Sequence, residues 1–127
     1  MKKKRGERDE KARLRRLQEI ARLTELTERA EKDMEKKRQI VECAEKLWRE
    51  GHAPRLAEAL KAGHPCPVCG ATAHPEPARA AVGAPSDAQL ERLRAESRSA
   101  KDHYECIRAR LQSMECAHGA AEELDNQ

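Results

Sequence analysis

Aromatic residues are nearly absent from this 127-residue chain, which contains one Trp, one Tyr and no Phe. Because aromatic side chains fill much of a globular core, their scarcity argues against a compact sphere. Hydrophobic residues make up 38% of the chain and charged residues 39%. So small a supply of apolar side chains favours thin, elongated packing of helices.

Long apolar stretches are missing as well. No segment approaches the ~20 apolar residues of a membrane-spanning helix, and the opening MKKKRGERDE lacks the apolar part of a secretory signal. Neither charge sign is in marked excess, since 26 Lys and Arg face 23 Asp and Glu, whereas nucleic-acid binders usually carry a basic surplus. We predict a cytoplasmic protein without a membrane segment, and the charge gives no sign of direct DNA contact.

Proline and glycine are confined almost entirely to the middle of the chain. All six Pro lie between residues 54 and 85, and four of the six Gly lie between 51 and 85. Both flanks are rich in Glu, Arg, Lys, Leu and Ala, which favour helix. We predict a coiled-coil arm over 1–50, a second arm over 86–127, and a turn-rich segment over 51–85 with a short helix from Pro54 through Lys61, stopped by Gly63.

Apolar residues in both arms recur at alternating steps of three and four, which is the a/d seam of a coiled coil. Leu14 and Leu17 fall out of this register, so we expect a stammer or a frayed end near residue 17. Ser86 and Gln89 fit a capping box at the start of the second arm. The seam positions are Ile20, Leu23, Thr27, Ala30, Met34, Lys37, Val41, Ala44 and Trp48, then Leu90, Leu93, Ser97, Ala100, Tyr104, Ile107, Leu111, Met114, His118 and Ala121.

Neither arm can bury its apolar stripe alone. Two such helices joined by a turn-rich segment most readily pack against each other, so we predict an all-α fold, an antiparallel coiled-coil hairpin with the middle segment at its apex. Two isolated helices, or a bundle formed with other chains, are the alternatives.

The middle segment contains a tight cysteine pair, Cys66-Pro67-Val68-Cys69-Gly70. Five cysteines, an odd number in a chain without an export signal, favour thiols or metal ligands over disulfides. Two thiolates at this spacing can share one tetrahedral zinc at ~2.3 Å each, and Gly70 can take a positive φ that turns backbone N–H groups toward the sulfurs. We predict zinc as the cofactor and Cys66 and Cys69 as its ligands. The three other cysteines are predicted to be helix-surface residues: Cys43, Cys106 and Cys116.

One cysteine pair supplies two of the four ligands that structural zinc requires. A second copy of the chain can supply the other two, with two apices meeting about a two-fold axis in a homodimer. His64 and His74 are the local alternatives, although we expect His74, next to Pro75, to be a structural loop residue. Iron or cadmium could occupy the same thiolate cage. A thioredoxin-like redox role lacks the strand and helix that such chemistry uses.

The middle of the chain closely resembles the zinc-hook region of the bacterial SbcC family. The residues that carry this resemblance are Leu60, then Gly63-x-Pro65-Cys66-Pro67-Val68-Cys69-Gly70, then His74-Pro75 and Pro77-Ala78, with heptads on either side. The resemblance implies a part of an SMC-like DNA repair and recombination ATPase that works with the SbcD nuclease on double-strand DNA ends. The family's hook cysteines correspond to Cys66 and Cys69.

The chain has no Gly-x-x-x-x-Gly-Lys-[Ser/Thr] loop, and we predict no catalytic residues and no enzyme activity for it. The 65 residues before Cys66 and 58 after Cys69 are what a hook cut from a longer rod would show. We therefore predict a zinc-dependent homodimerisation module, whose parent would reach the nuclease and DNA. The rivals are a monomeric zinc adaptor that adds His64 and His74 to the two cysteines, and a helical interaction protein with incidental thiols.

Overall fold

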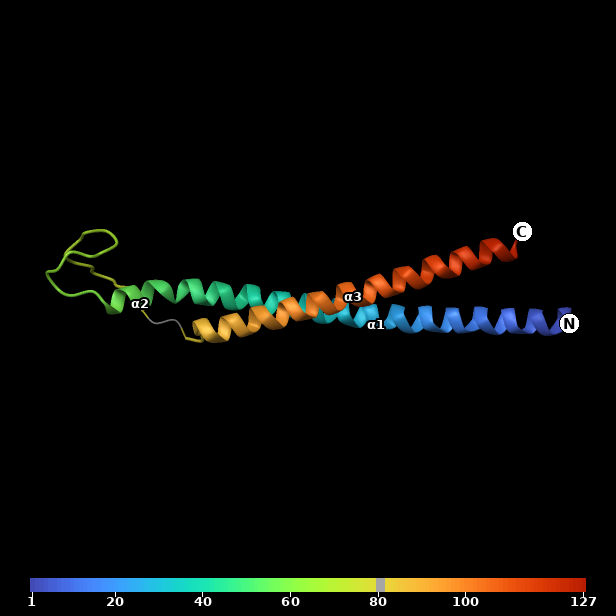
Figure 1. Cartoon of the computed structure of the whole chain (residues 1–127). Helices are drawn as coiled ribbons and strands as arrows, with labels where there is room; N and C mark the ends of the chain where they lie inside the picture. The colour runs from blue at the N-terminus through green and yellow to red at the C-terminus, as the bar shows by residue number, and fades with distance from the viewer. Residues whose placement is uncertain (80–81) are drawn as a thin grey trace. The chain divides into compact units, whose positions relative to one another are not determined.

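A computed structural model describes residues 1–79 and 82–127. The described residues form three helices and no strand: α1 (Lys2–Glu50), α2 (His52–Glu58) and α3 (Asp87–Asp125) (Figure 1). The prediction of an all-α helical hairpin is thereby confirmed. No helix in the described part of the chain is both long enough and apolar enough to cross a bilayer. The chain divides into two compact units, each of which pairs part of α1 with part of α3.

Unit 1 consists of Met1–Lys37 and Ser97–Gln127. Its two helical stretches run antiparallel, with both chain termini at the same end of the unit (Figure 1). Near that end, the Nε of Arg13 lies 2.7 Å from Oε1 of Glu122. This hydrogen bond is the largest cause of the lowered pKa of the Glu122 carboxyl.

Small and aliphatic seam residues form the core of unit 1. Leu23 is 1% exposed, and Ala30, Ala100 and Ile107 are also buried. In both units every predicted seam position is buried or partly buried. The three-four spacing therefore identified the contacting faces of both arms correctly.

The expected stammer near residue 17 is wrong. Helix α1 continues unbroken to Lys2, and Leu14 and Leu17 are 47% and 37% exposed on its outer side. Counting back from Ile20 by four and then three residues gives Arg16 and Arg13, and both are partly buried. Because an arginine can pack its long aliphatic stem along the partner helix, the seam continues with two residues that do not look apolar.

Unit 2, Arg38–Glu96, contains the end of α1, the whole of α2 and the start of α3. Arg94 Nε contacts Glu45 Oε1 at 3.0 Å, and Trp48 Nε1 donates to Asp87 Oδ1 at 2.6 Å. Leu90 is 1% exposed and fully buried in this unit. The order of these contacts along the two helices shows that they are antiparallel here as well.

The start of α3 has the predicted capping box. The backbone N–H of Gln89 donates to Ser86 Oγ at 3.2 Å, and the Gln89 side chain accepts from the N–H of Ser86 at 2.9 Å. Asp87 lies in the first turn, where the helix dipole favours a carboxylate. The second arm therefore begins at a defined place.

Helices α1 and α2 are separated only by Gly51, which keeps a helical backbone. The break has a chemical cause, because Pro54 has no N–H to donate to the carbonyl four residues before it. A Cβ added to Gly51 would lie 3.2 Å from the Cβ of Ala84, so glycine permits the returning chain to pass closely. α2 ends at Glu58, not at Lys61 as predicted, since the N–H groups of Ala59 and Leu60 tighten into i→i+3 bonds with Leu56 and Ala57.

Candidate metal centre

The loop that follows α2, residues 59–79, is here named the apex loop, and it folds around the cysteine pair. The N–H of Gly70 donates to the carbonyl of Cys66 at 2.8 Å, and the N–H of Cys66 donates to the carbonyl of Ala71 at 2.9 Å. Gly70 has φ +76°, as expected from the sequence, which is a backbone conformation that side chains with a Cβ disfavour. These features close a tight turn with the two cysteines on it.

The sulfur of Cys66 is surrounded by backbone donors. The residue is only 9% exposed, and the N–H of Val68 lies 3.4 Å from its Sγ. Backbone N–H groups lower the pKa of the Cys66 thiol, with Cys69 the largest contributor and Val68 the second, while burial acts in the opposite direction. The turn therefore favours the thiolate, which is the form that binds metal.

A histidine completes a cluster with the two cysteines. The ligand atoms of Cys66, Cys69 and His74 all lie within 4.8 Å of one another, close enough to bind a metal ion. Cys69 Sγ and His74 Nε2 are 3.3 Å apart. Around tetrahedral zinc, with bonds of about 2.3 Å to sulfur and about 2.05 Å to nitrogen, neighbouring donors are separated by about 3.6–3.8 Å. The donor types and their spacing thus fit such an ion after small side-chain adjustments.

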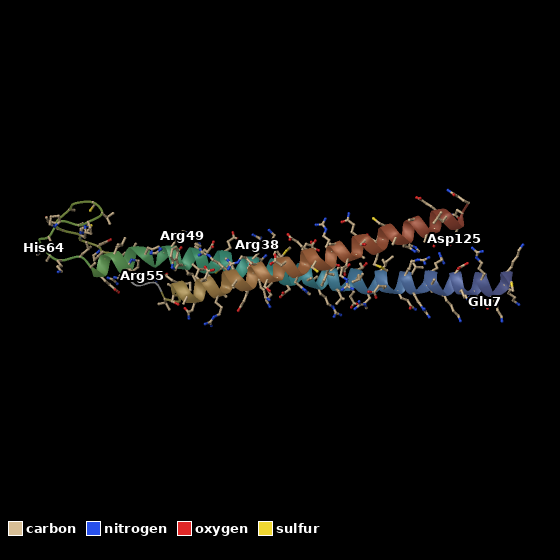
Figure 2. The ribbon with its side chains drawn as sticks, viewed as in Figure 1. Glu7, Arg38, Arg49, Arg55, His64 and Asp125 are labelled. Carbon is tan, nitrogen blue, oxygen red and sulfur yellow. The ribbon has the colours of Figure 1, made fainter. Side chains whose placement is uncertain are left out.

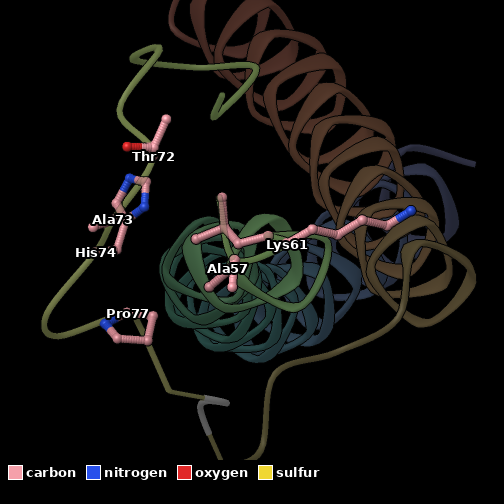
Figure 3. Close-up of a pocket in the computed structure, with 8 residues that line it drawn as sticks. Ala57, Lys61, Thr72, Ala73, His74 and Pro77 are labelled. Atoms are coloured by element: carbon pink, nitrogen blue, oxygen red, sulfur yellow. The ribbon is translucent and has the colours of Figure 1, made fainter. Parts of the chain in front are cut away.

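The ring of His74 lies beside a cavity between the apex loop and α2 (Figure 3). The cavity measures about 400 Å³, and its wall includes Ala57, Leu60 and Lys61. The next residue, Pro75, restricts His74 to extended backbone conformations. His74 is therefore a partly buried residue with a restricted backbone and a ring that lines the cavity.

The other candidate ligands lie elsewhere. His64 is exposed at the outer edge of the apex loop (Figure 2), where its Nδ1 lies 3.3 Å from the carbonyl of Ala62, and it is not part of the three-residue cluster. Cys43, Cys106 and Cys116 are exposed on the helices, as predicted.

The sequence offered His74 as an alternative ligand but favoured a structural loop role, and the structure brings its Nε2 to 3.3 Å from Cys69 Sγ. A usable signal was nevertheless present, since His74 follows Cys69 by five residues with Gly70 between them and Pro75 behind. A glycine that reverses the chain and a proline that straightens it can bring a histidine back toward the thiols.

Comparison with known proteins gives one informative similarity. The chain is 42% identical over 71 residues, 55% of its length, to the C subunit of the SbcCD nuclease of Rhodobacter capsulatus. The chain spans only 5% of the length of that relative. No family model matches the chain. No solved structure matches it either. The identity over these 71 residues shows that this chain carries an SbcC-related region.

Proposed function

We propose that this chain is a zinc-mediated homodimerisation module, in which two apex loops share one zinc ion through Cys66 and Cys69 of each copy. One observation carries the proposal: the structure presents two thiol groups, one of them with its pKa lowered, on a loop where Cys69 is exposed. Cysteine pairs of this kind leave two positions of a tetrahedral zinc for another donor pair. A second copy provides that pair with the same geometry.

Metal binding, not apolar burial, would dominate the energy of this contact. Within the described apex loop, residues 59–79, Val68 is the one large apolar residue that is exposed, at 72%, so each apex offers only a small apolar surface. Structural zinc in peptide-sized sites contributes about 10–16 kcal/mol of apparent binding free energy at neutral pH. Four thiolates around Zn²⁺ leave a charge of −2, which the ammonium of Lys61 on the wall of the neighbouring cavity would partly offset.

The similarity to the SbcC protein of the SbcCD nuclease supplies the biological setting of the proposal. In a longer SbcC-like parent, joining two apices would link two complexes, or two arms of one complex, that carry a nuclease partner and hold DNA ends. The chain itself would bridge and transmit, while catalysis would belong to other parts of the assembly. We place this role in the cytoplasm, where thiols stay reduced and available to metal.

The monomeric zinc adaptor is the second candidate, and His74 favours it. With Cys66 and Cys69, His74 gives one chain three donor atoms in one cluster. A complete intrachain site of two cysteines and two histidines would need a further donor, and His64 is directed elsewhere. We prefer the dimer, because a second copy can supply the missing ligands as a second cysteine pair.

Light scattering during a cycle of metal removal and return tests the proposal. The chain with half an equivalent of zinc should have the mass of a dimer, fall to the mass of a monomer when a chelator is added, and become a dimer again when zinc is returned. Magnesium serves as the control, since it prefers oxygen ligands and should not restore the dimer. A mass that ignores zinc would contradict the proposal, and a zinc-bound monomer at every protein concentration would support the adaptor.

A further inference from the structure

The third donor at the apex has no role in a site made of four cysteines. His74 Nε2 lies 3.3 Å from Cys69 Sγ, and it belongs to the same cluster as Cys66. Building on the proposed dimer, we propose that His74 is a zinc ligand of the single chain: with Cys66 and Cys69 it holds the ion until the cysteine pair of a second copy displaces it.

Local backbone geometry brings His74 to the cysteines. The bond from Cys66 N–H to the carbonyl of Ala71 returns the chain toward the first cysteine, and Gly70 permits the reversal with φ +76°. His74 follows three residues after Ala71, with its backbone restricted by Pro75. Because these constraints exist within one chain, the three donors are preorganised without a partner.

The three donor residues differ in their exposure to solvent, and this difference suits a temporary third ligand. Cys66 is sheltered in the turn at 9% exposure, and His74 is partly buried beside the cavity, but Cys69 is exposed. The ion would therefore be held from one side, with water as its fourth ligand on the open side. An incoming chain would reach the metal from that side.

The exchange of ligands conserves atoms and charge. A second, metal-free chain brings two thiols, which form two Zn–S bonds and release two protons to solvent. The bonds from zinc to His74 Nε2 and to the water break, and the imidazole leaves as a neutral group. The charge of the site changes from zero, with two thiolates on Zn²⁺, to −2 with four. The single-chain state and the shared state therefore compete for zinc.

This competition predicts that the dimer has an optimum zinc concentration. At half an equivalent of zinc, each ion can be coordinated by the four thiolates of two chains, so dimers should dominate. With a large excess of zinc each chain can fill its own three-donor site, so the dimer fraction should fall. Without the imidazole the single-chain site is poor, and the dimer should persist to higher zinc.

The experiment is a zinc titration of the chain followed by light scattering, with His74→Asn and His64→Ala as variants. Asparagine keeps an amide that can hydrogen-bond to Cys69 but is a poor zinc ligand, while His64 is an apex histidine outside the cluster. The wild-type chain and His64→Ala should lose the dimer at excess zinc, and His74→Asn should require at least about 100-fold more zinc to do so, since even the loss of a group that only orients a ligand costs about 10–100-fold in affinity.

Cobalt absorption provides a second readout, since tetrahedral cobalt is coloured and zinc is not. In dilute protein with excess Co²⁺, each ion should show the charge-transfer intensity of two thiolates, and at half an equivalent in concentrated protein that of four. Identical titrations for the wild-type chain and His74→Asn, in both metals, would overturn the role of His74 while leaving the dimer intact. Failure of every variant to dimerise at half an equivalent would instead overturn the proposed function.

Discussion

The helical arms and the apex loop differ in how many residues determine their structure. In the arms, the packing of the helices is determined by many seam positions, which include Thr27, Lys37 and Ser97. Every one of these positions is at least partly buried. In the apex loop a few residues carry the information, because Cys66 and Cys69 provide the thiols and Gly70 provides the positive φ. A repeated pattern tolerates exceptions, whereas a set of single-purpose residues does not.

This contrast predicts that the two regions fail independently. Loss of the metal should separate the chains and leave the helices formed, because each pair of helical stretches has its own contacts. Loss of a seam residue should destabilise the helices and leave the local geometry of the cysteine turn intact. Substitutions at the proposed metal ligands should therefore have larger effects on dimerisation than substitutions in the arms.

Cys69→Ser should produce the largest effect. It leaves one thiolate per chain, so the proposed shared zinc site would lose two of its four sulfurs, and zinc-dependent dimerisation should be abolished at micromolar protein. Helical circular dichroism should stay within a few per cent of the wild type. Cys116→Ser, which removes an exposed cysteine from α3, is the matched control and should dimerise normally. Loss of most of the helicity in Cys69→Ser would show that the metal organises the arms as well.

Acidification should remove zinc and the dimer together. The pKa of Cys66 is lowered in the folded loop by backbone N–H groups, first that of Cys69 and then that of Val68. At pH values above the ordinary thiol pKa of about 8.5, the stabilisation that comes with the lowered pKa is fully present. As the pH falls through the lowered pKa, the thiolate is protonated and this stabilisation is lost. Bound zinc extends retention to still lower pH, because protons and the metal compete for the same sulfurs.

The pH dependence can be measured by recording mass by light scattering and free zinc with an indicator over the same pH series. The two transitions should coincide. A dimer that persists after the zinc has been released would mean that contacts between arms hold the chains together.

Leu23→Ala should weaken the arms without affecting the metal. Leu23 is 1% exposed in unit 1, and truncation of a buried leucine costs about 2–5 kcal/mol. The midpoint of thermal unfolding should fall, while the zinc affinity measured well below that midpoint should not change. Leu14→Ala is the matched control, since Leu14 is 47% exposed and outside the seam. Equal destabilisation by the two substitutions would contradict the assigned seam.

Two glycine substitutions give the smallest effects and should have opposite signs. A Cβ at Gly70 or at Gly119 would meet nothing within 4 Å, so only the backbone conformation distinguishes the two positions. Gly70 has φ +76°, and alanine in this region costs about 1–2 kcal/mol, so Gly70→Ala should weaken zinc binding about 5–30-fold. Gly119 lies within α3, and Gly119→Ala should stabilise the helix by about 0.5–1 kcal/mol.

Zinc titration and thermal melts of both variants test this pair. Zinc binding by Gly119→Ala should match the wild type. A stable, tightly binding Gly70→Ala would show that the turn does not need its left-handed residue.

Sequence reasoning predicted the arms well because the three-four period is local and redundant. It correctly located the seams, the Ser86–Gln89 cap and the positive φ of Gly70. It failed where the environment of a residue, and not its type, determined the local structure. Arg13 and Arg16 occupy seam positions with their stems, and the end of α2 depends on how its last turn tightens.

The position of His74 is the feature of the apex loop that the sequence left open. Its approach to Cys69 depends on the path of a loop without regular secondary structure, set by two backbone hydrogen bonds and by Gly70. Such paths leave no periodic trace in a sequence. The type of residue showed that it could bind metal, but only the folded loop placed its nitrogen beside a sulfur.

The most direct test of the central claim is the molar zinc content of a dimer whose mass has been measured in the same sample. A dimer purified after addition of half an equivalent of zinc should contain one zinc ion for two chains, and the ion should leave as the mass falls to that of one chain. A dimer that contains two ions, or none, would contradict the sharing of one zinc by two pairs of cysteines.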